Sequence, residues 1–174
     1  SHSGRRGAYK TWKATDCVMG ITAPGLFARN CSVRRLDKAS AAAFLDANHR
    51  MGTCKCRYCY GLFVDRTTGS REAQAEAGSL VAVASFSAGR TMRDGTRSFE
   101  WIRFASLRGL RVIGGMGKLL DSFVQEHSPD DVMTYVDASD SDGSAYMELG
   151  FTREALIQRN GWSNIKLRKS FTKD

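Results

Sequence analysis

The middle of the chain contains Phe99-Glu-Trp-Ile-Arg-Phe-Ala-Ser106, then Arg111-Val-Ile-Gly-Gly-Met-Gly-Lys-Leu-Leu120, Val132-Met-Thr-Tyr-Val-Asp137 and Ser144-Ala-Tyr-Met-Glu-Leu-Gly-Phe151. These patterns predict a strand, a glycine loop that opens a helix, a second strand and a second helix. A glycine-rich turn after an apolar strand leaves backbone N–H groups free, and the positive end of the following helix points into the same space. The loop is therefore a candidate diphosphate cradle, or a tight turn that needs glycine only for its backbone angles.

Length and composition predict one compact domain with a core. The chain has 174 residues, of which 42% are hydrophobic and 25% charged. No apolar run approaches the roughly 20 residues that cross a membrane, so no membrane partner is expected. Lys and Arg outnumber Asp and Glu by 26 to 18, giving a net charge of +8. This charge favours an anionic partner: nucleic acid, a phosphorylated cofactor or an acidic protein.

The cysteines predict a reducing environment. There are five, Cys17, Cys31, Cys54, Cys56 and Cys59. An odd count and the absence of a visible secretion signal favour the cytoplasm or another reducing compartment. A structural zinc site needs four ligands, and no second C-x-x-C follows the last three cysteines. The favoured interpretation is a strand that displays Cys54, Cys56 and Tyr58 on one face.

Residues 1–30 form a predicted basic N-terminal arm, and residues 31–174 form the domain. The arm carries aromatic side chains among its cations, and we expect it to pack on the domain or, alternatively, to stack on nucleic-acid bases. The other patterns predict strands at 32–36, 60–64, 80–86, 152–157 and 162–171, and a helix at 38–48 that Asp37 caps.

The strand at 98–106 has charged residues in an apolar frame. Strict alternation places Phe99, Trp101 and Arg103 on one face, and Glu100, Ile102 and Phe104 on the other. Buried charges are costly unless they are paired, so Glu100 and Arg103 meet partners or face a ligand cleft. His49 ends the first helix, where contact with the last carbonyls is the default structural interpretation.

Two motifs resemble those of the GNAT superfamily of acyl-CoA N-acyltransferases. Arg111-Val-Ile-Gly-Gly-Met116 is similar to its phosphate loop, Gln/Arg-x-x-Gly-x-Gly/Ala, except that Met116 replaces the last small residue. Tyr146-Met-Glu-Leu-Gly-Phe151 is similar to its Tyr-x-x-x-Gly-Phe helix end. The resemblance implies an α/β (α+β) fold with a mixed central sheet of six to seven strands flanked by helices. Its central strands, 99–106 and 131–137, are expected to splay apart around a cofactor.

The resemblance also implies roles for individual residues. Acetyl-CoA or another acyl-CoA is the expected cofactor, Tyr146 the acid that protonates the leaving thiolate, and Glu100 the base that accepts a proton from the amine. Met116 could crowd the diphosphate, which keeps open a GNAT-like domain that only binds nucleic acid. The cofactor-binding residues implied are Arg111, Ile113, Gly114, Gly115, Met116, Gly117 and Lys118.

Residues Phe44–Lys169 resemble more closely a GNAT-like domain of phage genomes, which is related to the Mom protein that modifies adenine in DNA. This resemblance implies that His49 and Asp137 are catalytic and bind iron. The leading hypothesis is an acyl-CoA-dependent transferase acting on an amine of a nucleic-acid base or of another polyanion-associated substrate. Metal-dependent base modification is the alternative, and the sequence does not specify an oligomeric state.

Overall fold

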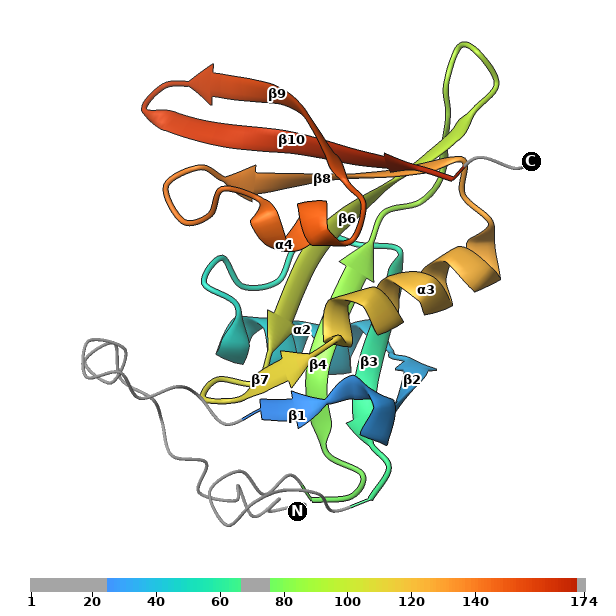
Figure 1. The fold of residues 1–174 in the computed structure, drawn as a ribbon, viewed down its shortest axis with the longest axis vertical. Coiled ribbons are helices and arrows are strands. Elements are labelled where there is room, and N and C mark those ends of the chain that lie inside the picture. The colour runs from blue at the N-terminus through green and yellow to red at the C-terminus, as the bar shows by residue number, and fades with distance from the viewer. Residues whose placement is uncertain (1–24, 67–75, 172–174) are drawn as a thin grey trace.

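A computed structural model describes residues 25–66 and 76–171 (Figure 1). Most of the predicted N-terminal arm, together with Cys17, lies outside the described residues. The strands are β1 (Gly25–Phe27), β2 (Cys31–Arg35), β3 (Tyr58–Val64), β4 (Leu80–Phe86), β5 (Arg90–Thr91), β6 (Arg97–Ser106), β7 (Arg111–Ile113), β8 (Asp131–Asp137), β9 (Thr152–Arg159) and β10 (Trp162–Ser170). The helices are η1 (Ala28–Asn30), α2 (Lys38–Asn48), α3 (Gly115–His127) and α4 (Ser144–Glu148).

One mixed sheet organises the molecule, with strand order β2-β3-β4-β6-β8-β10-β9 and β5 paired to β6. All neighbours in it are antiparallel except β6 and β8. A separate pair joins β1 to β7 in parallel. Helices α2 and α3 cover opposite faces of the half formed by β2, β3, β4 and β6 (Figure 1). The expected mixed sheet flanked by helices is confirmed.

The core on the α3 side is built from aromatic rings. Phe86 and Phe123 stack with centroids 4.0 Å apart, and Trp101 stacks on Phe86 at 5.4 Å. All three side chains are almost completely buried. Offset and edge-on aromatic pairs add to the free energy gained from apolar burial. This cluster fixes β6 against α3.

The central strands part halfway along their length. β6 and β8 pair only at Ser98–Asp131, Phe99–Val132 and Glu100–Met133. Beyond this point each strand stays paired to its outer neighbour, β6 to β4 and β8 to β10. The Thr134 hydroxyl donates to the Trp101 carbonyl at 2.9 Å, so a side chain closes the fork where the backbone ladder ends. The splay expected between 99–106 and 131–137 is present.

A β-bulge corrects the predicted alternation in β6. Phe86 pairs with Trp101 but Ser85 pairs with Arg103, so Ile102 is the extra residue. A bulge of one residue reverses the face on which all later side chains lie. Phe104 therefore joins Trp101 on the α3 side, while Arg103 joins Glu100 on the other face.

The cysteine strand predicted before Tyr58 is wrong. β3 begins at Tyr58, so Cys54 and Cys56 lie in the preceding loop, and Cys59 points into the small core beneath α2. The loop between α2 and β3 is therefore longer than the pattern suggested. Within residues 53–57, the backbone contact with a strand is the hydrogen bond from Arg57 N–H to Phe86 O of β4.

Candidate functional site

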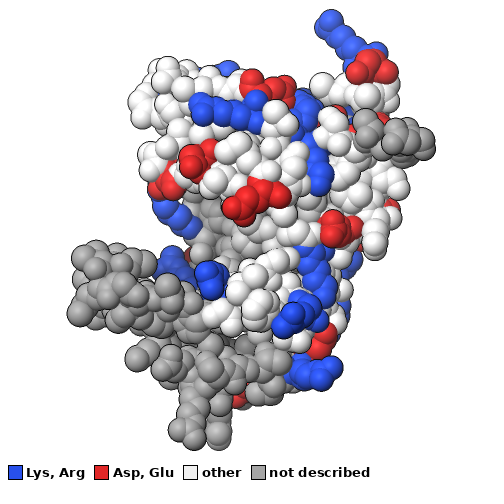
Figure 2. All heavy atoms as spheres, in the orientation of Figure 1, with Lys and Arg blue, Asp and Glu red and all other residues white. Residues whose placement is uncertain are grey.

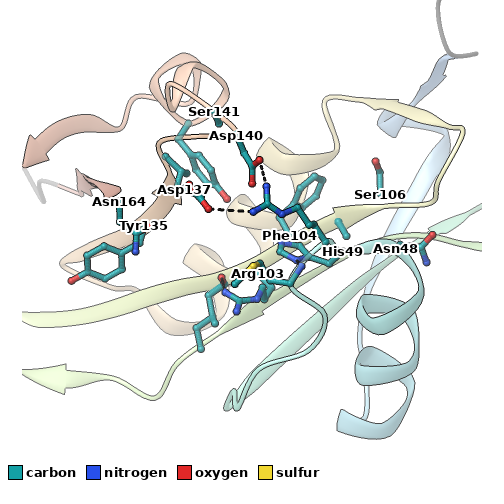
Figure 3. Close-up of a pocket in the computed structure, with 16 residues that line it drawn as sticks. Asn48, His49, Arg103, Phe104, Ser106, Tyr135, Asp137, Asp140, Ser141 and Asn164 are labelled. Carbon is teal, nitrogen blue, oxygen red and sulfur yellow. Dashed lines mark hydrogen bonds and ion pairs between the residues drawn. The ribbon is translucent and has the colours of Figure 1, made fainter. Parts of the chain in front are cut away.

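The fork between β6 and β8 opens into a cavity of about 580 Å³ (Figure 3). One wall is formed by the last part of β6, from Ile102 to Ser106, and the other by Tyr135–Asp137. The end of α2 and the following loop, residues 48–51, form a third side. The cavity therefore collects side chains from segments far apart in the sequence.

Tyr146 of α4, for which the sequence motif predicts a functional role, lines this cavity. Its ring packs edge-on against Trp101 and Phe151, with centroid distances of 5.2 and 5.6 Å. Burial raises the pKa of Tyr146 to about 12, opposed by the neighbouring Thr134 hydroxyl and the charge of Arg103. The phenol thus keeps its proton at neutral pH and can act as a proton donor.

His49 also lines the cavity, but one ring nitrogen is hydrogen-bonded within its own loop. The Met51 N–H donates to His49 Nδ1 at 3.0 Å. Burial, and then the charge of Arg103, lower the pKa of His49, so the ring is neutral at pH 7. A neutral imidazole carries one proton, and because Nδ1 is an acceptor the proton is on Nε2. His49 therefore presents a hydrogen-bond donor to the cavity.

Asp137 lies across the cavity and is engaged as well. Its Oδ1 accepts from the Ser139 N–H and hydroxyl at 2.9 and 2.6 Å. Arg50 forms ion pairs with Asp137 Oδ2 at 3.5 Å and with Asp140, shown as dashed lines in Figure 3. The Ser139 bonds, more than the Arg50 charge, lower the pKa of Asp137.

The iron site predicted for His49 and Asp137 is not supported. The two side chains do line one cavity. However, a neutral imidazole that binds a metal through Nε2 carries its proton on Nδ1. His49 Nδ1 could then no longer accept the hydrogen bond from the Met51 N–H. Among the described residues, no group of three or more histidine, cysteine, aspartate and glutamate side chains could hold a metal ion.

Glu100 lies at the last paired position of β6, just before the fork, and is not among the residues that line the cavity. Burial raises its pKa, while the charge of Arg103 on the same face opposes the shift. A raised pKa is the direction that a general base needs, and the role predicted for Glu100 stays a prediction because its side chain does not line the cavity.

The glycine loop opens α3 and, within the part of the chain that the structure describes, leaves backbone N–H groups unpaired at the start of the helix. Gly114 precedes α3 with φ +80°, a conformation that favours glycine, and the helix has no side-chain cap among the described residues. The first helical bond runs from Lys118 N–H to Gly114 O. The N–H groups of Gly115, Met116 and Gly117 therefore precede the helical ladder, and the first turn carries no acidic residue.

A second cavity, of about 460 Å³, lies in front of this helix start. A Cβ added at Gly114 would meet only Ala28, at 3.8 Å, so the loop is open to a ligand. Arg29 lines the cavity and packs over the Phe27 ring. Two backbone-directed features, the free N–H groups and the open approach, fit the diphosphate of a coenzyme.

Three residues of the predicted phosphate loop have other roles. The Lys118 ammonium donates to the Ala28 and Cys31 carbonyls and ties η1 to α3. Lys118 also lines the cavity in front of the helix start, so its charge contact with the diphosphate stays a prediction. Met116 packs against the core and does not line the cavity, so it does not crowd a ligand there. Arg111 lies in β7, paired to β1.

Sequence reasoning missed the cation and carboxylate at the mouth of the cavity. Arg50 and Asp140 both line it, and their ion pair joins the loop after α2 to the turn after β8. The acidic run Ser139-Asp-Ser-Asp-Gly143 was the available signal, since two aspartates directly after a central strand lie at its carboxyl end.

The basic C-terminal strand is largely neutralised within the molecule. Arg168 forms ion pairs with Asp131 at 2.7 Å and Glu154 at 2.8 Å, and Lys166 lies 3.7 Å from Glu154. Basic and acidic side chains are interspersed on the face shown in Figure 2. None of the described helices is long and apolar enough to span a bilayer.

The sequence matches no model of a known protein family and no curated protein. Solved structures do resemble the fold. Arabidopsis thaliana Naa50, in complex with the bisubstrate analogue CoA-Ac-MVNAL, has a TM-score of 0.58 at 13% identity, covering 82% of this chain and 99% of that one. Spermidine N-acetyltransferase from Vibrio cholerae has a TM-score of 0.59 at 9% identity, covering 82% and 94%.

The ribosomal-protein-S18-alanine N-acetyltransferase from Escherichia coli has a TM-score of 0.53 at 14% identity, covering 83% of this chain and 96% of that one. These matches show that the chain has the fold of the GNAT N-acetyltransferases. They give no support to the resemblance to the phage-type domain related to the Mom protein.

Proposed function

We propose that this protein transfers an acyl group from an acyl-CoA to an amine. The observation that carries the proposal is the fork between β6 and β8, whose cavity is lined by Tyr146. Helix α3, which lies between these two strands in the chain, starts without a side-chain cap. The similar Naa50 structure holds a coenzyme A bisubstrate analogue, which fits this arrangement. Acyl-CoA, when bound, supplies the acyl group as an activated thioester.

The backbone at the start of α3 is the proposed diphosphate site. The N–H groups of Gly115, Met116 and Gly117 are not used by the helix, and the helix dipole places positive charge there. Arg29 stands at the same cavity and would add a cation near the phosphates. Met116 would contribute through its backbone, since its side chain packs against the core.

Proton movement is assigned to two side chains. Tyr146 keeps its proton at neutral pH and would donate it to the departing thiolate. Glu100, whose pKa burial raises, would accept the proton of the amine through water.

The carboxylates of the cavity are the feature that would select a cationic amine acceptor, and the guanidinium groups of Arg50 and Arg103 balance their charge. Asp137 and Asp140 line the cavity and already hold the guanidinium of Arg50. Carboxylates at this position would attract a second ammonium group on the acceptor and would repel phosphates. An amine on nucleic acid, which the net charge favours, is the competing acceptor.

Calorimetric titration with acetyl-CoA tests the cofactor site in a matched pair of variants. Gly114→Asn and Gly114→Asp place side chains of similar size at the same left-handed position, where both residues are tolerated better than most. Only the aspartate brings a negative charge to the free N–H groups. We expect Gly114→Asp to bind acetyl-CoA about tenfold more weakly than Gly114→Asn, equivalent to about 1.4 kcal/mol.

Equal affinities in the two variants would overturn the diphosphate assignment. Binding by the wild type is followed by a thiol-release assay with putrescine, with n-butylamine and with single-stranded DNA as acceptors. Release with the amines supports the proposed acceptor. Release with DNA alone, lost as salt is raised, would instead support the nucleic-acid acceptor.

A further inference from the structure

A pair of thiols lies outside the cavity, where the loop between α2 and β3 runs into β3. Cys56 Sγ and Cys59 Sγ lie 3.0 Å apart, which is about 1 Å more than the length of a disulfide bond. Cys56 is half-buried, whereas Cys59, in β3, is 1% exposed. A small movement would bring the two sulfur atoms within bonding distance.

Neighbouring strands hold the backbone of this pair in place. The Arg57 N–H donates to the Phe86 carbonyl of β4 at 2.9 Å. The Cys59 carbonyl accepts from the Leu36 N–H, after β2, also at 2.9 Å. Because the backbone is held at Cys59 and at Arg57, next to Cys56, the conformational entropy lost when the thiols bond is reduced.

The two cysteines have different environments. Cys59 points into the core beneath α2 and β4, beside Leu45 and Val83. Burial, and then the hydrogen bond with Cys56, raise the pKa of Cys59, so it is a thiol at neutral pH. Cys56 lies at the surface of this core and is the sulfur that a dissolved molecule reaches. One exposed and one buried thiol suit an attacking and a resolving role.

We propose that Cys56 and Cys59 form a reversible redox site that reacts with small disulfides such as oxidised glutathione. Cys56 loses its proton to solvent as its sulfur attacks one glutathione sulfur, which forms a mixed disulfide and releases one glutathione thiolate. Cys59 then loses its proton to solvent as its sulfur attacks Cys56 Sγ. The Cys56–Cys59 bond forms and the second glutathione thiolate leaves, so two electrons pass from the cysteines to the glutathione disulfide.

The bond would restrain one wall of the cavity. The same loop contributes Arg50 and Met51 to the cavity, and it is held by the ion pairs of Arg50 with Asp137 and Asp140 and by contacts of Gly52 and Thr53. The Thr53 N–H donates to Asp46 Oδ1 at 2.8 Å, and Arg103 Nε donates to the Gly52 carbonyl at 3.3 Å. Fixing Cys56 adds a covalent anchor at the far end of the loop. Formation of the bond does not depend on the proposed acyl transfer.

Peptide mapping tests the site in the full chain. The protein is equilibrated with mixtures of reduced and oxidised glutathione, and its free thiols are then alkylated. We expect a peptide with Cys56 and Cys59 joined, lacking two hydrogens, while Cys54 stays alkylated. Cys54→Ser should leave this product unchanged, Cys56→Ser should abolish it, and Cys59→Ala should stop at glutathione on Cys56.

Three results would overturn the proposal: alkylation of both cysteines at every glutathione ratio, a bond that includes Cys54, or a stable glutathione adduct on Cys56 of the wild type. Circular dichroism establishes whether each variant is folded. If Cys59→Ala does not fold, Cys56→Ser still tests the site, because the Cys56 side chain lies outside the fully buried core. Amide hydrogen exchange at 50–55 should slow on oxidation of the wild type and stay unchanged in Cys56→Ser. Unchanged exchange in the oxidised wild type would overturn the restraint of the cavity wall.

Discussion

Trp101 and Phe104 lie three residues apart on β6 and yet meet on one face of the sheet, with ring centroids 6.2 Å apart. Strict alternation would put them on opposite faces. The extra residue Ile102 makes the contact possible, because it lets β6 keep its pairing with β4 while the side chains change face. The bulge lies directly beyond the last pair between β6 and β8, so it lies where the fork opens.

Deleting Ile102 should therefore weaken acetyl-CoA binding while the fold is kept. Without it, Trp101, Arg103 and Phe104 alternate regularly and keep their present faces, so the free energy of unfolding should change by less than about 2 kcal/mol. The straightened strand should narrow the fork, and acetyl-CoA should bind at least about tenfold more weakly. Urea unfolding and calorimetry measure the two effects. Ile102→Ala, which keeps the bulge, is the control, and unchanged binding after the deletion would contradict the role of the bulge.

Tyr146→Phe should lower kcat by about a hundredfold and leave the Kd of acetyl-CoA unchanged, because the ring still packs on Trp101 while the proton is lost. Burial raises the pKa of Tyr146 to about 12. The wild-type kcat should therefore show no decline from this group up to about pH 10. Steady-state rates of the two proteins across pH test this, and a variant as fast as the wild type would remove Tyr146 from the mechanism.

Asp140→Asn should selectively weaken the binding of an acceptor amine that carries a second positive charge. Losing one carboxylate from the cavity is expected to raise KM for putrescine about fivefold, equivalent to about 1 kcal/mol, and to leave KM for n-butylamine unchanged. Arg50→Ala frees the same carboxylates and should shift KM for putrescine downward. Both side chains of the Arg50–Asp140 pair are largely exposed, so neither change should alter the free energy of unfolding by more than about 0.5 kcal/mol. Equal effects on both amines would contradict a cationic acceptor.

Local patterns were enough to predict the elements that position the site. Asp37 does cap α2, accepting from Ser40 N–H at 2.9 Å, and Gly114 does start α3. Such features depend on residues a few positions apart, and so they are visible in a single sequence. The motif that contains Tyr146 is equally local, and the structure places this residue at the cavity.

Features that depend on distant partners were not predicted. The bulge at Ile102 is defined only by the register of β6 against β4. Lys118 resembles a phosphate ligand in sequence, but its ammonium meets the Ala28 and Cys31 carbonyls once η1 lies beside α3. The ion pair of Arg50 with Asp140 likewise joins loops 90 residues apart. Each depends on tertiary pairing, which periodicity does not encode.

A histidine far from the cavity should make stability depend on pH. The His127 ring packs on Tyr58 and Phe123, with centroids 4.1 and 4.7 Å away, and its Nε2 lies 2.9 Å from the Tyr60 hydroxyl. Burial lowers the pKa of His127, and the charges of Arg35 and Arg97 add to the shift while Glu126 opposes it. Because the folded protein resists protonation, its stability is complete above the unfolded pKa of about 6.5 and is lost as pH falls below that value.

Urea unfolding between pH 7.5 and 5.5, roughly the range in which histidine titrates, should therefore show a free energy of unfolding that becomes smaller as the pH is lowered. His127→Phe keeps the ring packing and removes the titration, so it should cost about 1 kcal/mol at neutral pH through the lost Tyr60 contact and should flatten the slope. The slope that persists in this variant belongs to His49, whose pKa burial also lowers. A variant that keeps the full wild-type slope would show that His127 is not the group that titrates.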